Sequence, residues 1–139
     1  MRQKGFTLLE VLVAILVLSI GLLGLAGLMA SSLRNNHSAY YRSQATWLAY
    51  DVIDRMRINR PNAADYDVAM GAASAAGGLA GADVTGWKAE LAEVLPEGDG
   101  SVLVVPAGEA RTVTVEIRWN DARGTLGDAA QTFRVVSQL

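Results

Sequence analysis

An apolar segment with no charged side chain, from Val11 to Leu33, constrains this chain more than any other feature. A run of more than 20 such residues is long enough to cross the hydrocarbon core of a bilayer as a helix. Arg2 and Lys4 precede it, and basic residues on that side favour a cytoplasmic N-terminus. We therefore predict a single-pass membrane protein whose remaining chain lies outside the cytoplasm.

Two simpler explanations of this segment are a secretory signal peptide and a plain signal-anchor helix. A signal peptide has a shorter apolar core that ends at a cleavage site between small residues. Here the run is longer, and helical sequence continues beyond Ala30 without a break. A plain anchor agrees with the hydropathy but leaves Glu10, a few positions inside the apolar run, without a role.

Glu10 is costly in this position unless a cation reaches it. A charged side chain in hydrocarbon costs about 2.5–3.5 kcal/mol even on insertion scales that give low values. The free amides at a helix N-terminus favour an anion, and a free α-amino group nearby would add a full positive charge. Cleavage between Gly5 and Phe6 would create such an amine.

The segment Lys4-Gly5-Phe6-Thr7-Leu8-Leu9-Glu10-Val11 resembles the leader of type IV prepilins and of type II secretion pseudopilins. The resemblance implies that a prepilin peptidase removes residues 1–5 and N-methylates Phe6. It also implies that Glu10 pairs with the N-terminal amine of a neighbouring subunit during assembly. In this family the anchor lies in the inner membrane and the head in the periplasm, before any incorporation into an extracellular pilus.

A continuous helix is predicted from Phe6 to Arg60, because the first proline is Pro61. Residues 6–32 form its transmembrane and assembly part. Within that part, Gly21, Gly24 and Gly27 recur every third residue. Small residues let membrane helices approach closely, but glycine also weakens a helix. Two roles of these glycines remain open, namely close packing between helices and local melting of the helix in the filament.

Residues 33–60 are predicted to continue the helix as an amphipathic segment. One predicted apolar stripe contains Leu33, Tyr41, Ala45, Leu48, Val52 and Met56. Arg42, Asp54, Arg55, Arg57 and Arg60 are assigned largely to the opposite side. Asp51 and Arg55 have the spacing of a favourable i,i+4 ion pair. The stretch from Tyr41 to Arg60 resembles the PilV minor pilins, the accessory subunits often labelled pilus modification proteins.

Residues 61–139 are predicted to form a small head. The alanine- and glycine-rich stretch Gly71–Ala82 is expected to be a surface loop, followed by a helix over 83–95 that Pro96 stops. A turn at Glu97–Gly100 precedes predicted strands at 101–105, 112–119 and 131–137. The fold class is therefore α+β and pilin-like, with the long helix covering a small antiparallel sheet. Trp119 is expected in its core.

The chain offers little for catalysis, and we predict no enzymatic activity and no catalytic, cofactor-binding or metal site. It has no cysteine and one histidine, His37, which is expected on an exposed helix face. A net charge of −2 does not favour nucleic acid as a partner.

The predicted function is that of a minor type IV pilin that primes pilus assembly, with a role in twitching motility. Its expected partners are other minor pilins, the major pilin, the prepilin peptidase, the inner-membrane assembly platform and the lipid bilayer. Two alternatives remain open. One is a minor pseudopilin of type II secretion, and the other is a single-pass anchored binding or adhesion domain that does not polymerise.

Overall fold

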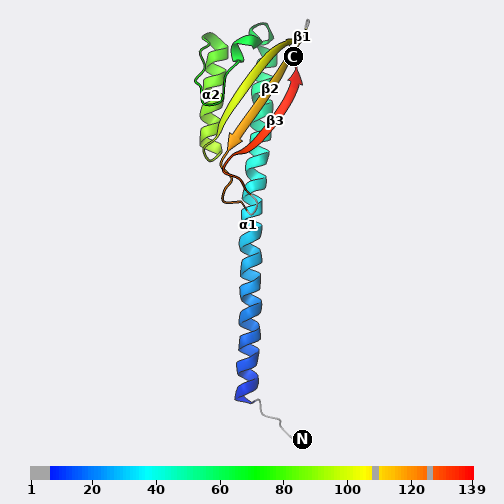
Figure 1. Ribbon diagram of the computed structural model, residues 1–139, viewed down its shortest axis with the longest axis vertical. Coiled ribbons are helices and arrows are strands. Elements are labelled where there is room, and N and C mark those ends of the chain that lie inside the picture. Colours follow the sequence, from blue (N-terminus) through cyan, green and yellow to red (C-terminus); the bar gives the residue numbers. More distant parts are fainter. Residues whose placement is uncertain (1–6, 108–109, 125–126) are drawn as a thin grey trace.

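The computed structural model describes residues 7–107, 110–124 and 127–139. The molecule is elongated, with one long helix that carries a small head at its C-terminal end (Figure 1). The head contains a second helix and a three-stranded antiparallel sheet. This arrangement confirms the predicted α+β, pilin-like fold.

Helix α1 runs from Leu8 to Ile58 without interruption, and its 51 residues span about 75 Å. The Thr7 side chain caps its start by accepting a hydrogen bond from the backbone N–H of Glu10. The helix was predicted to continue to Arg60, but it ends at Ile58. Pro61 has no backbone N–H with which to continue the α-helix, and the chain turns there into a 3₁₀ helix, η1, at Arg60–Tyr66.

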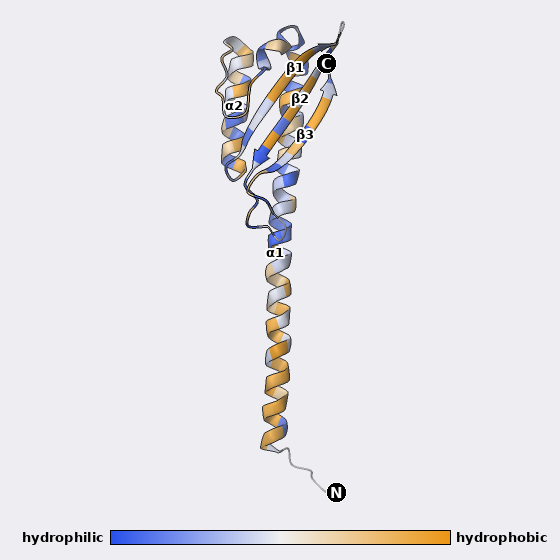
Figure 2. Ribbon diagram, in the orientation of Figure 1, coloured by the Kyte–Doolittle hydropathy of each residue, from blue (hydrophilic) through white to orange (hydrophobic). Residues whose placement is uncertain are grey.

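The two halves of α1 have different surroundings. In Figure 2 the N-terminal half of α1 has mostly hydrophobic colours, whereas the part nearer the head has more white and blue. No residue of α1 before Ala45 is buried. Beyond that point one face of the helix enters the core, through Ala45, Leu48, Ala49, Val52, Ile53 and Met56.

The structure corrects two assignments on this second half. Leu33 was placed on the buried stripe, but 62% of its surface is exposed, because it lies before the part of the helix that the head covers. Arg55 was assigned to the solvent side, but it is only half-exposed and faces the second helix. The predicted Asp51–Arg55 ion pair is present, at 2.7 Å.

Helix α2 spans Gly78–Val94, so it begins well before the predicted start at residue 83. The expected surface loop over Gly71–Ala82 is therefore wrong in its second part. Ala80 and Gly81 in this first turn are buried. Gly81 leaves no room for a Cβ atom against the backbone of Ala76, so the low-complexity stretch packs closely there.

The sheet is a meander of β1 (Asp99–Ala107), β2 (Ala110–Trp119) and β3 (Gln131–Gln138). β2 lies in the centre, with Val102 opposite Val115 and Ile117 opposite Phe133. β1 begins earlier than predicted, so Asp99 and Gly100 belong to the strand and not to the turn before it. The predicted alternation in β2 is confirmed, since Val113, Val115, Ile117 and Trp119 are all buried.

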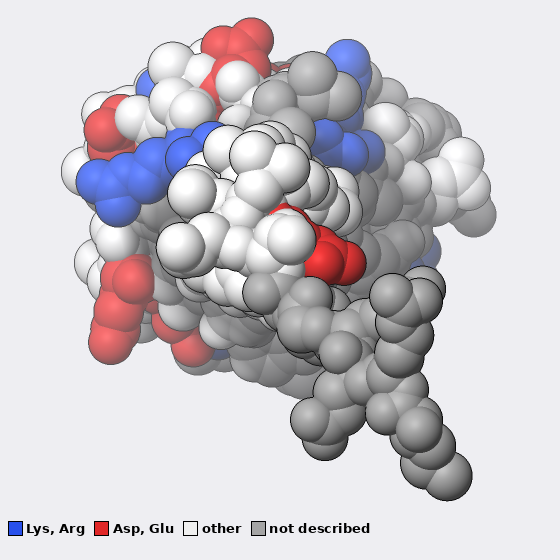
Figure 3. Space-filling model, turned by 90° about the horizontal axis from the view of Figure 1, so that it is seen from below, with Lys and Arg blue, Asp and Glu red and all other residues white. Residues whose placement is uncertain are grey.

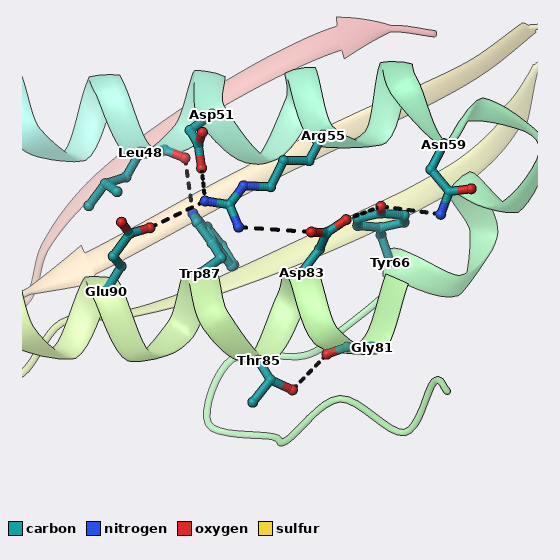
Figure 4. Close-up of polar contacts among 10 residues, drawn as sticks. All are labelled: Leu48, Asp51, Arg55, Asn59, Tyr66, Gly81, Asp83, Thr85, Trp87 and Glu90. Carbon is teal, nitrogen blue, oxygen red and sulfur yellow. Dashed lines mark hydrogen bonds and ion pairs between the residues drawn. The ribbon is translucent and has the colours of Figure 1, made fainter. Parts of the chain in front are cut away.

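The core lies between one face of the sheet, α2 and the C-terminal part of α1. Trp87 of α2 is fully buried, and its Nε1 donates a hydrogen bond of 2.9 Å to the backbone oxygen of Leu48 in α1 (Figure 4). Arg55 also joins the two helices, through ion pairs to Asp83 at 3.9 Å and Glu90 at 3.4 Å. Trp119 is buried as predicted.

Candidate anchoring and assembly site

The stem, Leu8–Leu33, is the candidate site for anchoring in a membrane. By length and composition α1 is able to cross a bilayer, and none of the residues in its most apolar stretch is buried inside the protein. The buried core helix of a soluble protein would have its apolar side chains covered. Here leucine, valine and isoleucine side chains point outward on every side, as a helix in contact with lipid or other apolar helices requires.

Glu10 lies in the first turn of α1 and is the single charged residue between Leu8 and Leu33. Its backbone N–H donates to the Thr7 hydroxyl over 3.2 Å. Its carboxylate makes no hydrogen bond or ion pair with any residue that the structure describes. An anion close to the helix N-terminus is favoured by the helix dipole, but a charge-pairing partner for Glu10 has to come from elsewhere.

Thr7 caps the helix, a contribution not predicted from the sequence. Threonine followed three residues later by glutamate is the spacing of a capping box, and the structure contains the bond from the backbone N–H of Glu10 to Thr7. The spacing could have identified this cap. Glu10 therefore has a local role through its backbone, which is separate from any role of its carboxylate. Gly5 and Phe6, the predicted cleavage and methylation positions, lie outside the described residues.

The three stem glycines lie on an unbroken helix. A Cβ atom at Gly21, Gly24 or Gly27 would meet nothing within 4 Å. Packing inside this chain thus does not require a glycine at any of these positions. The absence of side chains leaves shallow places on the stem that a second helix could approach closely.

Large aromatic side chains extend the exposed apolar surface of α1 past the stem. Tyr40, Trp47 and Tyr50 are 53%, 62% and 48% exposed. Tyr40 and Trp47 are seven residues apart, which places them on one face of the helix. The core residues Leu48 and Val52 lie on the other side. This aromatic face is therefore available to a neighbouring molecule while the head stays folded.

The described residues contain no group of three or more histidine and acidic side chains that could hold a metal ion. His37 is exposed, as predicted.

The family model for the prokaryotic N-terminal methylation motif matches residues 1–26. The match includes Gly5, Phe6, Glu10 and most of the stem. Comparisons with curated proteins and with solved structures found no match. The motif supports a type IV pilin-like or pseudopilin protein, a structural and not a catalytic class. Together with the apolar helix, it is consistent with a single-pass membrane anchor. It also suggests assembly with other pilins and processing by a prepilin peptidase.

Proposed function

We propose that this protein is a minor type IV pilin of the PilV kind, which joins other minor pilins in the inner membrane and primes pilus assembly. The prepilin peptidase cuts between Gly5 and Phe6 and methylates Phe6. The N-terminus faces the cytoplasm and the head lies in the periplasm. The subunit then enters the filament or its tip, together with the major pilin and the assembly platform.

One observation carries this proposal. The methylation motif stands at the start of an exposed apolar helix that continues, without a break, into the core of a folded head. If the whole helix were a signal peptide, its removal would also remove Ala45 and Leu48 from the core of the head. Cleavage in front of the helix leaves both the stem and the head intact.

The Glu10 carboxylate has no partner among the described residues, and this supports assembly through the stem. Cleavage after Gly5 would place a new amine four residues before Glu10 in every subunit. An amine on one stem and a carboxylate on the next form an ion pair that removes the cost of an isolated anion in hydrocarbon. The aromatic face of Tyr40, Trp47 and Tyr50 offers further contact area along the same helix.

The experiment that tests this role compares Glu10→Gln with the wild-type protein in cells. Glutamine keeps the backbone N–H that binds Thr7 and is a good helix former, so it removes the charge and little else. We expect the variant to be cleaved normally but to lose copurification with its partner pilins. Glu93→Gln is the matched control, because Glu93 is exposed on α2 outside the stem.

Mass spectrometry of the wild-type N-terminus tests the processing step, with a methylated Phe6 as the expected result. An uncleaved protein that functions normally, or a Glu10→Gln variant that assembles normally, would contradict the proposal and favour an anchored binding domain. Deletion of the gene distinguishes a role in the pilus from a role in type II secretion. Loss of twitching supports a pilin, whereas loss of exoprotein secretion supports a pseudopilin.

A further inference from the structure

A pocket of about 800 Å³ lies under the head, where α1 leaves it toward the stem. We call it the base pocket and define it by Arg34, His37 and Tyr41 of α1, Glu97 of the turn after α2, and Asp121 and Arg123 of the segment after β2. Its volume is in the range typical of pockets that hold small ligands. Seen along the stem, this underside of the head carries both basic and acidic side chains (Figure 3).

The base pocket lies at the depth of a membrane surface if the stem spans a bilayer. Val11–Leu33 is about 34 Å long as a helix, slightly more than the hydrocarbon thickness of about 30 Å. Arg34 is the next residue, so its guanidinium would reach the layer of lipid headgroups. Arg34 and Tyr41 are seven residues apart and lie on the side of α1 that the head covers farther along.

The acids of the base pocket already have partners. Asp121 is 3% exposed, and its Oδ2 accepts a 2.7 Å hydrogen bond from the Ser38 hydroxyl. The Glu97 Oε1 accepts a 3.0 Å hydrogen bond from the side-chain amide of Asn120.

The two cations of the pocket are different. Within the described parts of the chain, neither Arg34 nor Arg123 forms an ion pair or a side-chain hydrogen bond. Two exposed guanidinium groups from separate segments therefore border one pocket, and neither donates to a residue that the structure describes.

Hydrogen bonds fix the wall of the base pocket. The φ of Glu97 is 54°, as the third residue of a turn closed by the Gly98 N–H and the Leu95 oxygen requires. The backbone N–H of Asn120 donates to the Pro96 oxygen over 2.8 Å, and its side-chain amide donates to the Glu97 carboxylate. The turn after α2 is therefore held against the segment that follows β2.

We propose that the base pocket binds the phosphate of an anionic phospholipid headgroup at the membrane surface. Arginine presents planar donors that match phosphate oxygens, and Arg34 and Arg123 supply two such groups. The His37 and Tyr41 side chains border the same space and can donate to the remaining oxygens or to the glycerol. The binding would orient the head against the membrane before assembly. It requires a membrane-spanning stem but not polymerisation.

The test uses the full chain in detergent micelles, with native mass spectrometry to measure retained lipid. Phosphatidylglycerol and phosphatidylcholine with identical acyl chains are compared. We expect phosphatidylglycerol to be retained about tenfold more tightly, because phosphatidylcholine carries the same phosphate together with a choline cation that the two guanidinium groups repel. Arg34→Gln and Arg123→Gln should each remove most of this preference. Arg42→Gln, on the same helix but outside the pocket, should leave it unchanged.

A second variant separates lost binding from misfolding. Asp121→Asn keeps an acceptor for Ser38 but removes a negative charge from the pocket, so it should tighten the binding of phosphatidylglycerol. Equal retention of the two lipids, or equal retention by wild type and the Arg34 and Arg123 variants, would overturn the proposal. Complete displacement of phosphatidylglycerol by an equal concentration of inorganic phosphate would also overturn it, because the site would then bind free anions. None of these outcomes depends on whether the protein forms pili.

Discussion

Trp87 and Trp119 are both buried, but only one of them uses its indole N–H. Trp87 donates to the backbone oxygen of Leu48 across the α1–α2 interface. The Nε1 of Trp119 is buried without a hydrogen-bond partner among the described residues. Replacement by phenylalanine removes a similar apolar area at both sites, so this part of the cost is nearly the same for the two variants.

The difference in unfolding free energy therefore comes from the N–H groups. Trp87→Phe loses a buried hydrogen bond, which contributes about 1 kcal/mol. Trp119→Phe removes an unsatisfied buried donor, whose desolvation costs about 1–3 kcal/mol. We expect Trp87→Phe to be the less stable variant by about 2 kcal/mol or more, and Trp119→Phe to be close to the wild type.

Urea unfolding of the full chain in detergent micelles measures this difference. Each variant keeps one buried tryptophan of the head, whose fluorescence reports the transition. The stem remains in the micelle, so the signal follows the head alone. Equal destabilisation by the two substitutions would refute the reasoning, as would a greater effect of Trp119→Phe.

Two further predictions concern the edge of the core near β1. Gly100 leaves no room for a Cβ atom against the Trp87 ring, so Gly100→Ala should destabilise the head by about 1–3 kcal/mol in the same unfolding assay; an unchanged midpoint would contradict this packing. Burial raises the pKa of Asp99, but hydrogen bonds from Lys88 and from the backbone N–H groups of Gly100 and Gly71 outweigh it and hold the pKa below 3.8. The stabilisation by Asp99 is therefore present above pH 3.8 and lost as the pH falls through the lowered pKa. Asp99→Asn should reduce the stability gap between neutral and acidic urea unfolding, and an unchanged gap would count against this assignment.

The parts of the fold that follow a simple period could be predicted from the sequence. The apolar stretch Val11–Leu33 and the absence of proline before Pro61 indicate one long helix. The alternation from Thr112 to Trp119 gives the central strand and its buried face, because successive side chains of a strand point to opposite sides.

Features that depend on contacts between elements could not be predicted in this way. Arg55 has the sequence pattern of a solvated charge, and its position beside Asp83 and Glu90 depends on where α2 packs. Helix α2 begins at Gly78, in a stretch of alanine and glycine whose local helix propensity is weakened by its glycines. The burial of Ala80 against the rest of the head overrides this weak propensity. The base pocket joins segments more than 80 residues apart, so no local pattern marks it.

For the candidate assembly site, the residue type alone pointed to Glu10, because a carboxylate in an apolar segment is anomalous wherever the chain folds. The cap by Thr7 could also have been found from spacing. The proposed partner of Glu10 belongs to a neighbouring subunit, so the sequence of one chain does not position it.

Ala45 is the first buried residue of α1. It separates a part of the helix that is mostly exposed from a part that packs one face into the head. No side chain of the stem, Leu8–Leu33, is buried in the head, so a substitution there can change how subunits pack or how deeply they lie in lipid at little cost to folding. Ser38 and Tyr41 lie before the boundary but already contact the head, through Asp121 and the core. A substitution after it on the core side affects the head first. The stem can thus adapt to new neighbouring molecules while the globular part of the protein remains the same.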